Sequence, residues 1–266
     1  MGGRLCVGSY EREVEASLAR VWENVLDWEH LPWLHPESFL AVKLQGCDRQ
    51  GWRAEVVLPP ADRAARLNLE LRLDRERLRY VARTLQGPGA GSEIWTTLLP
   101  RGERATGIHV EFWLAGVRAP DAETLGAGYC SLYARLWDQD EAMMRRRQAL
   151  LDGALGSRAS RLDGLSLGPA QALRARAPTC IEAGGRRLGV VELDGRLIAY
   201  ATVCPHLGGP LEVSALDAGC ITCPWHGYRF DLRHGRSADG RSLALDVFAV
   251  EVDPSTGEAR LGGAAA

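Results

Sequence analysis

Cys204-Pro205-His206 and Cys223-Pro224-Trp225-His226 lie sixteen residues apart in this 266-residue chain. Each stretch supplies one thiol and one imidazole, and both groups are good ligands for transition metals. A turn that contains glycine follows each stretch, at 207–211 and at 227–231. Because glycine has no side chain to obstruct a turn, the two loops can fold over one metal centre. The spacing therefore indicates a shared centre with two sulfur and two nitrogen ligands.

This Cys-x-His and Cys-x-x-His arrangement resembles the Rieske ferredoxin domain. The resemblance implies a [2Fe–2S] cluster with Cys204 and Cys223 on one iron and His206 and His226 on the other. Zinc sites use the same residue types, but they usually pair Cys-x-x-Cys with histidines or with a second Cys-x-x-Cys. A purely structural role in turns would not explain why each histidine follows a cysteine at a fixed spacing. We therefore predict a Rieske cluster.

The loop residues also predict the redox potential of the cluster. In high-potential Rieske proteins, two further cysteines staple the loops, and Ser and Tyr hydroxyls donate hydrogen bonds to the cluster and its cysteine ligand. By resemblance, Gly209 and Trp225 take the places of the stapling cysteines here, and Tyr228 and Phe230 take those of the Ser and Tyr. Hydrogen bonds to sulfur raise the potential, so we expect the low end of a range from roughly −150 to +300 mV.

Composition limits the function classes. The chain has 32 basic and 34 acidic residues and a formal net charge of −2, which argues against nucleic acid or an anionic membrane as partner. No signal peptide or transmembrane stretch is visible, so we expect a cytoplasmic protein. Five cysteines remain beside the two ligands: Cys6, Cys47, Cys130, Cys180 and Cys220. In a reducing compartment we expect these to be buried small apolar residues, and we expect Cys220 to belong to a strand.

The length allows two domains, each with its own core. Residues 153–178 are rich in Gly, Ala, Arg and Ser, and we predict that they form a linker. Residues 179–263 contain short runs of β-forming residues separated by Asp-Gly and Gly-Gly turns. This pattern predicts an all-β Rieske domain built from antiparallel hairpins.

Residues 1–152 follow a different pattern. We expect a strand at 4–15, a helical segment at 17–35, several strands within 39–117 and one long helix at 121–152. A curved antiparallel sheet that grips a C-terminal helix would enclose a cavity. This order, with the segment 21–36, resembles the START-like helix-grip (SRPBCC) superfamily, which includes lipid carriers, polyketide cyclases and the catalytic domains of Rieske oxygenases. The predicted fold class is α+β helix-grip followed by all-β.

The segment from Asp27 to His35 is similar to the mononuclear-iron segment of Rieske oxygenases, which reads Asp-x-x-His-x-x-x-x-His. The resemblance implies that His30 and His35 are iron ligands and that Asp27 is a catalytic carboxylate that orients them and bridges the two metal sites. Non-haem oxygenases bind iron through two histidines and one carboxylate, which leaves open positions for O₂. In the family the third ligand lies in an acidic stretch of the C-terminal helix, here 137–141.

Helical geometry selects Asp140 as this third ligand. On a regular helix Asp140 lies within an apolar stripe, whereas Asp138 points the opposite way. The stripe comprises Tyr129, Leu132, Tyr133, Leu136, Met143, Met144 and Leu151. A carboxylate on such a face is costly unless it is paired or binds a metal. We therefore predict mononuclear Fe(II) at His30, His35 and Asp140.

Two observations count against a mononuclear iron. On an unbroken helix, Leu18, Val21 and Val25 mark the buried side, and His30 lies away from it, unless Pro32 breaks the helix at Leu31. Metal-free helix-grip proteins often carry a similar run. The domain order is the reverse of that in Rieske oxygenase large subunits, whose catalytic domain is longer; this difference bears on substrate size and oligomer geometry and does not by itself remove the chemistry. Three other features are weaker candidates. We expect His109 to be a sheet residue or to line the cavity, His234 to be a turn residue, and the run 145–147 to be an exposed helix end that could also dock an acidic ferredoxin.

The leading hypothesis is a Rieske non-haem iron oxygenase. A reductase or ferredoxin would reduce the cluster through a solvent-facing His206 and His226, and the mononuclear iron would activate O₂ against a small hydrophobic substrate. The alternative is a Rieske electron-transfer protein fused to a metal-free domain that binds a hydrophobic ligand or docks a partner. A homo-oligomer is compatible with either hypothesis.

Overall fold

The computed structural model describes residues 3–153 and 162–264. It divides the chain into two compact units, Met1–Arg145 and Arg146–Ala266. Each unit has its own sheet and its own hydrophobic core. The two-domain organisation expected from length and composition is therefore present, and each unit is described by itself below.

The first unit is built on one antiparallel sheet of seven strands in the order β1-β7-β6-β5-β4-β3-β2. The strands are β1 (Arg4–Val14), β2 (Ala41–Asp48), β3 (Gly51–Leu58), β4 (Ala65–Asp74), β5 (Arg79–Gln86), β6 (Glu93–Pro100) and β7 (Thr106–Ala115). Strands β2 to β7 follow each other as a meander. The first strand of the chain, β1, pairs with β7 along its whole length. Alternate residues of β7 face the core, as the sequence pattern predicted.

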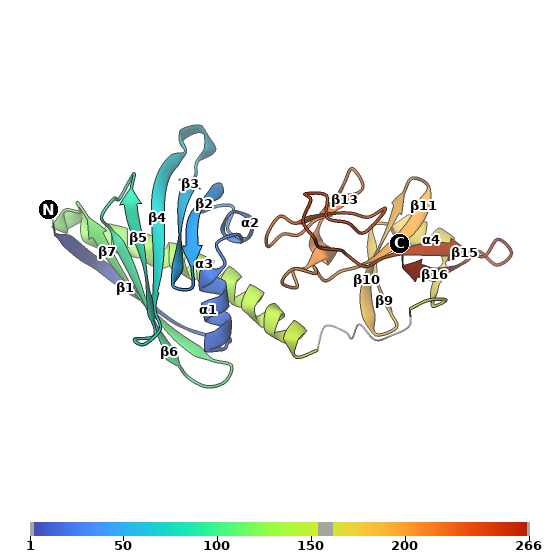
Figure 1. Cartoon of the computed structure of the whole chain (residues 1–266), viewed down its shortest axis with the longest axis horizontal. Helices are drawn as coiled ribbons and strands as arrows, with labels where there is room; N and C mark the ends of the chain where they lie inside the picture. Colours follow the sequence, from blue (N-terminus) through green and yellow to red (C-terminus); the bar gives the residue numbers. More distant parts are fainter. Residues whose placement is uncertain (1–2, 154–161, 265–266) are drawn as a thin grey trace. The chain divides into compact units, whose positions relative to one another are not determined.

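The long helix α3 (Ala122–Leu151) runs across one face of this sheet (Figure 1). Its aromatic residues Tyr129 and Tyr133 pack on Phe112 of β7, with ring centroids 5.2 and 5.1 Å apart. Glycine lets helix and sheet meet, because a Cβ at Gly126 would lie 2.2 Å from the carbonyl oxygen of Val7. The unit therefore has the helix-grip architecture predicted from the sequence.

The segment predicted as one helical stretch at 17–35 forms two helices, α1 (Leu18–Leu26) and α2 (Leu31–Leu34). Ser17 caps α1 by accepting a hydrogen bond from the Arg20 amide. The short 3₁₀ turns η1 (Ala61–Arg63) and η2 (Ala119–Asp121) complete the unit. The break between α1 and α2 decides where the two histidines point.

The second unit contains a six-stranded antiparallel sheet in the order β8-β16-β15-β11-β10-β9 and a three-stranded sheet in the order β12-β13-β14. The large sheet contains β8 (Ser166–Pro169), β9 (Thr179–Ala183), β10 (Arg186–Leu193), β11 (Arg196–Ala201), β15 (Val247–Val252) and β16 (Glu258–Ala264). The small sheet contains β12 (Leu216–Asp217), β13 (Cys220–Thr222) and β14 (Arg229–Asp231). Helix α4 (Ala170–Arg176) lies between β8 and β9 of the large sheet, and the turn η3 (Leu211–Val213) lies between β11 of the large sheet and β12 of the small sheet. The prediction of an all-β second domain is confirmed in its architecture.

The C-terminal part of the predicted linker at 153–178 differs from the prediction. Strand β8 pairs with β16, and Leu173 of α4 is buried in the core of the second unit. The strand and the helix were not predicted because small residues and arginines dominate this segment. Strand β8 has only four residues, and α4 contributes little apolar surface. The part at 154–161 lies outside the described residues.

The expectation of buried cysteines is wrong for Cys6 and Cys47, which are exposed. Cys130, Cys180 and Cys220 are half-buried, and Cys220 begins strand β13 as expected. Cys6 and Cys47 lie in β1 and β2 of the seven-stranded sheet, where alternation sends every second side chain out of the core. Within residues 3–153 and 162–264, no helix is both long enough and apolar enough to cross a membrane.

Candidate functional site

The two Cys/His loops of the second unit have the same backbone hydrogen bonds. In the first loop, the Cys204 amide donates to the Gly209 carbonyl at 2.9 Å, and the Gly208 amide donates to the Cys204 carbonyl at 3.0 Å. The second loop repeats both bonds at equivalent positions, from Cys223 to Tyr228 at 2.8 Å and from Gly227 to Cys223 at 2.9 Å. These bonds close each loop into a tight turn. The structure therefore pairs two equivalent ligand-bearing loops.

Both loops need glycine at the fourth position after cysteine. Gly208 has φ of 86° and Gly227 has φ of 69°, which is the left-handed region. A side chain there strains the backbone, and glycine does not. The glycines that suggested two folded loops in the sequence therefore have a specific conformational role.

The loops bring the four predicted cluster ligands together. The His206 and His226 rings lie with centroids 4.6 Å apart, and Cys204 and Cys223 are both buried and hydrogen-bonded to each other. The hydrogen bond from Cys204 lowers the pKa of the Cys223 thiol to about 5, and the same bond raises the pKa of Cys204. Thiolates are the form that binds metal. A closed set of two sulfur and two nitrogen donors fits a [2Fe–2S] cluster with mixed ligands.

The surroundings of the histidines differ from the expectation that both face solvent. His226 is 4% exposed and His206 is half-buried. The ring of Tyr228 stacks on His206, with centroids 4.3 Å apart and an interplanar angle of 29°. The Tyr228 hydroxyl accepts a hydrogen bond from Arg241, and Phe230 is fully buried without a hydroxyl. The expectation of a low potential stays a prediction.

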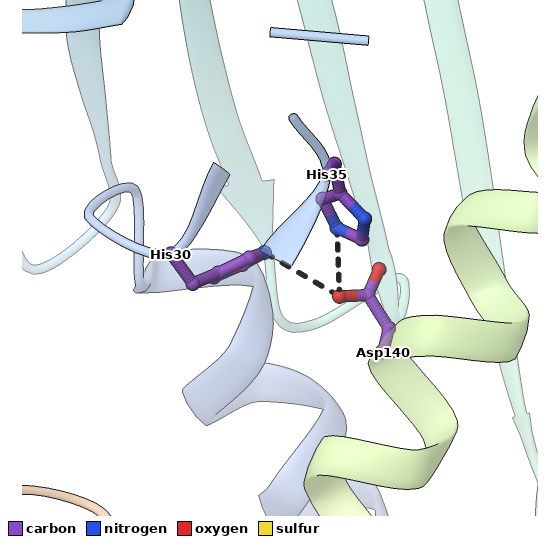
Figure 2. Close-up of side chains that lie close together, drawn as sticks. All are labelled: His30, His35 and Asp140. Carbon is purple, nitrogen blue, oxygen red and sulfur yellow. Dashed lines mark hydrogen bonds and ion pairs between the residues drawn. The ribbon is translucent and has the colours of Figure 1, made fainter. Parts of the chain in front are cut away.

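In the first unit, His30, His35 and Asp140 converge (Figure 2). The Nε2 atoms of His30 and His35 lie 3.4 and 3.2 Å from Oδ1 of Asp140. All three possible ligand atoms lie within 4.8 Å of one another, and the histidines are only 3% and 2% exposed. The residues chosen from the sequence are therefore brought together in a buried group that could hold one metal ion.

The break between α1 and α2 turns both histidines toward α3. Helix α1 ends at Leu26, and the Asp27 amide closes it on the carbonyls of Glu23 and Asn24. His30 then begins α2 and His35 ends it, with Pro32 in the first turn, where a missing amide hydrogen costs nothing. The sequence suggested a break at Leu31, and the structure breaks the helix earlier, at residues 27–30.

A second ring of polar groups orients the three candidate ligands. Oδ2 of Asp27 lies 3.5 Å from Nδ1 of His30, and Oε1 of Gln139 lies 2.6 Å from Nδ1 of His35. Asn24 Nδ2 donates to Oδ1 of Asp140 at 3.0 Å. Such contacts fix the tautomer and orientation of metal-binding histidines. Sequence reasoning missed Gln139, whose only signal was its place next to Asp140.

The electrostatics of this group favour charge separation. Burial lowers the pKa of His30, but hydrogen bonds to Asp140 and Asp27 outweigh it and raise the pKa to about 9. Burial raises the pKa of Asp140, and hydrogen bonds from His30 and His35 outweigh this effect and lower it far below its usual range. In the metal-free unit, His30 is therefore an imidazolium that faces an anionic Asp140 at neutral pH.

This pair predicts a pH dependence of stability for metal-free protein. The His30 contribution is fully present below the unfolded pKa of 6.5 and is lost as the pH rises through about 9. The Asp140 contribution is present above 3.8 and is lost at lower pH. We expect the free energy of unfolding of chelator-treated protein to fall by roughly 1–3 kcal/mol between pH 6.5 and 9.5. Denaturant unfolding measures it, with His30→Gln as the control that should lose this decline; an equal decline in both proteins would contradict the assignment.

The other charged candidates lie outside both groups. Asp138 is exposed, as the helical geometry predicted, and it pairs with Arg12. His109 lies on the outer side of β7 and contacts Glu11 at 2.9 Å, and His234 contacts Asp231. Arg145 pairs with Glu15. None of these side chains contributes to the two ligand groups described above.

Comparison with known proteins identifies the second unit. Residues 165–248 match the family described as Rieske [2Fe-2S] domain. Apoptosis-inducing factor 3 of Mus musculus is 34% identical over 74 residues, which are 27% of this chain and 12% of that protein. Cholesterol 7-desaturase nvd of Hemicentrotus pulcherrimus is 38% identical over 47 residues, 17% of this chain and 10% of that protein. The chain thus spans only about a tenth of the length of these relatives.

Solved structures resemble the first unit. A START superfamily protein from Mycobacterium smegmatis has a TM-score of 0.42 at 17% identity, covering 54% of this chain and 98% of that one. The Zhui aromatase/cyclase from Streptomyces sp. R1128 has a TM-score of 0.42 at 13% identity, covering 53% and 93%. These scores are low, so the fold assignment follows from the strand order and the position of α3. The chain therefore joins a START-like helix-grip unit to a Rieske [2Fe–2S] domain at residues 165–248.

Proposed function

We propose that this protein is an oxidoreductase of the Rieske non-haem iron oxygenase type. The Rieske domain itself implies a [2Fe–2S] cluster and iron–sulfur electron transfer. The further step is that the first unit holds a mononuclear Fe(II) at His30, His35 and Asp140. The observation that carries this step is the convergence of two buried imidazoles and one half-buried carboxylate.

The types of ligand support an iron site rather than a chance grouping of polar side chains. Two histidines and one carboxylate on one side of a metal are the ligand set of non-haem Fe(II) oxygenases. A buried carboxylate is costly unless it is paired or binds a metal, and Asp140 lies where both histidines reach it. Their second nitrogens already have orienting partners in Asp27 and Gln139. The ligands would therefore need little reorganisation to accept an ion.

Each protein group has a specific task under this proposal. A bound ferrous ion would supply redox chemistry and open coordination positions. Asp140 would neutralise part of the metal charge, while Asn24 holds its Oδ1 in place. Asp27 would hold His30 by its Nδ1 and, by resemblance, would lie on the route of the incoming electron. The electron would come from the cluster of this chain or of a neighbouring copy, after reduction by a reductase or ferredoxin.

The interior of the grip supports a hydrophobic substrate. Tyr80 and Tyr133 lie near enough to Asp140 to interact with its charge, and burial raises the pKa of both phenols far above the usual value. Phe112 and Trp22 extend this group of aromatic rings into the core. An apolar, aromatic interior excludes water and would favour apolar molecules. The substrate class we propose is therefore a small hydrophobic compound.

Iron stoichiometry tests the proposal. Protein purified without oxygen and supplied with Fe(II) should contain three irons and two acid-labile sulfides per chain. His35→Ala should reduce the count to two irons while the cluster remains, and it should abolish substrate-dependent O₂ uptake. His109→Ala is the matched control, because this histidine lies on the outer side of the sheet. A wild-type count of two irons with a full cluster would overturn the oxygenase proposal.

One observation favours a second candidate function, an electron-transfer Rieske protein with a metal-free binding domain. His30, His35 and Asn24 all reach the same oxygen of Asp140, so the group is internally paired without any ion. Under this alternative, Fe(II) would leave the unfolding temperature unchanged, and His35→Ala would leave the iron count unchanged. The same stoichiometry experiment therefore separates the two functions.

A further inference from the structure

We propose that Arg241 is a positioning residue that raises the reduction potential of the Rieske cluster by placing a cation on the ring that covers His206. This inference rests on the Rieske domain and its cluster, and it does not depend on a second iron. The side chain lies fifteen residues beyond the last ligand, outside both ligand loops. It is also outside the residues that the motif comparison predicted to tune the cluster.

Three side chains form a stack over the histidine side of the ligand group. The Tyr228 ring lies on the His206 ring, with centroids 4.3 Å apart at 29°. The guanidinium carbon of Arg241 lies 3.9 Å from the Tyr228 centroid, within the range of a cation–π contact. Nη1 of Arg241 also donates to the Tyr228 hydroxyl at 2.9 Å. The guanidinium therefore contacts both the face of the Tyr228 ring and the Tyr228 hydroxyl.

The segment that carries Arg241 is itself fixed. The Arg241 amide donates to Oγ of Ser237 at 3.3 Å, and its guanidinium contacts Asp239 at 3.1 Å. Ser237 in turn hydrogen-bonds to Asp239, and the Ala238 amide donates to the Arg229 carbonyl at 2.7 Å. These contacts tie the turn to strand β14, next to the second ligand loop. These contacts therefore restrict the position of the Arg241 side chain.

The direction of the effect follows from charge. Reduction transfers one electron from the donor to the cluster, so the cluster becomes more negative by one charge. A nearby cation stabilises this reduced state and raises the potential. Tyr228 is 5% exposed and separates Arg241 from His206 without a layer of water, so the interaction is screened less than it would be in solvent. Asp239 contacts the guanidinium at 3.1 Å and reduces the field of the cation, so the expected effect on the potential is moderate.

The stack also gives Tyr228 a second contact besides its ring on His206. Its hydroxyl oxygen accepts a hydrogen bond from Arg241 while the ring packs on His206. One side chain therefore links the cation to the histidine side of the ligand group. Arg241 would thereby keep the potential of the cluster from falling to a still lower value.

A reductive titration of the whole protein, followed by circular dichroism and by the EPR signal of the reduced cluster, tests the proposal. Arg241→Gln should lower the equilibrium constant for reduction about tenfold, which is about 59 mV toward negative potential for one electron. Arg241→Lys keeps the charge and should recover most of the shift. The EPR g-values should stay those of a Rieske cluster in each variant, which shows that the ligands are intact.

Arg174→Gln is the matched control, because it removes the same charge from the same unit. Arg174 pairs with Glu192 and contacts Gly195 at the end of β11 away from the first ligand loop, about 20 Å along the strand. Its potential should equal that of the wild type. An unchanged potential in Arg241→Gln, or an equal shift in Arg174→Gln, would overturn the proposal.

Tyr228→Phe is a second variant that tests the idea should Arg241→Gln fail to retain the cluster. It keeps the ring on His206 and removes the oxygen to which Arg241 donates. The cation loses one of its two anchors on the ring, so we expect a smaller shift toward negative potential. A potential that is unchanged or more positive, with full cluster content, would contradict the role of Arg241.

Discussion

Asp140→Asn is expected to remove the mononuclear iron and leave the Rieske cluster intact. The amide is neutral, so it no longer offsets the charge of a divalent ion or pairs with an imidazolium at His30. Loss of an orienting contact alone costs about 10- to 100-fold in metal affinity, and loss of a ligand should cost at least 100-fold. Anaerobic Fe(II) titration by calorimetry, with iron counted per chain, measures this effect.

The chain offers a matched control two residues away. Asp138 has a side chain that is 68% exposed and pairs with Arg12 at the surface. Asp138→Asn makes the same chemical change, and we expect normal iron binding and a stability loss below about 1 kcal/mol. Metal-free Asp140→Asn should lose roughly 3–5 kcal/mol, because a buried charge pair is broken. Wild-type iron affinity in Asp140→Asn would exclude this carboxylate as a ligand.

The different positions of these two aspartates could be predicted because α3 is one uninterrupted helix of 30 residues. On such a helix, 100° per residue fixes which side chains share a face, so the apolar stripe of the sequence is sufficient to locate Asp140. The same reasoning did not place His30, because α1 ends at Leu26 and helical periodicity does not apply beyond the end of the helix. Where a short helix breaks depends on packing and capping that no periodic pattern records.

Contacts between distant segments were the other limit of sequence reasoning. Gln139 meets His35 because α2 and α3 pack together, and the helical pattern of either segment alone carries no sign of that contact. Arg241 likewise meets Tyr228 through a turn that contains no motif. The cluster loops were predictable for the opposite reason: each loop closes on its own cysteine by local backbone bonds. Local loop structure could therefore be predicted, and contacts between distant segments could not.

Cys223→Ser is expected to abolish the Rieske cluster. A serine oxygen is a poor replacement for a thiolate on iron, which favours soft sulfur ligands in such clusters. Cys223 is buried, and the loop that carries it is closed by two backbone bonds, so no neighbouring thiol can take its place without breaking that turn. We expect cluster content to fall to less than about a tenth of wild type, measured by visible absorption, acid-labile sulfide and EPR.

Cys220→Ser provides the matched control and tests the only competing use of this cysteine. Cys220 is half-buried in β13, three residues before Cys223, and a Cys-x-x-Cys pair can act as a redox dithiol. With Cys223 committed to iron, Cys220→Ser should keep full cluster content and potential. Equal loss in both variants would mean that the two thiols act together and that the ligand assignment is wrong.

Combining the two experiments separates the two metal groups. Metal binding contributes directly to folding stability, so Cys223→Ser should also lower the unfolding temperature of the second unit. The first unit has its own core and its own candidate ligands, so the same variant should still bind one Fe(II) per chain. Asp140→Asn should show the reverse, with two cluster irons and no third. Loss of the third iron in Cys223→Ser would show that the first unit cannot hold metal by itself, contrary to the site built from His30, His35 and Asp140.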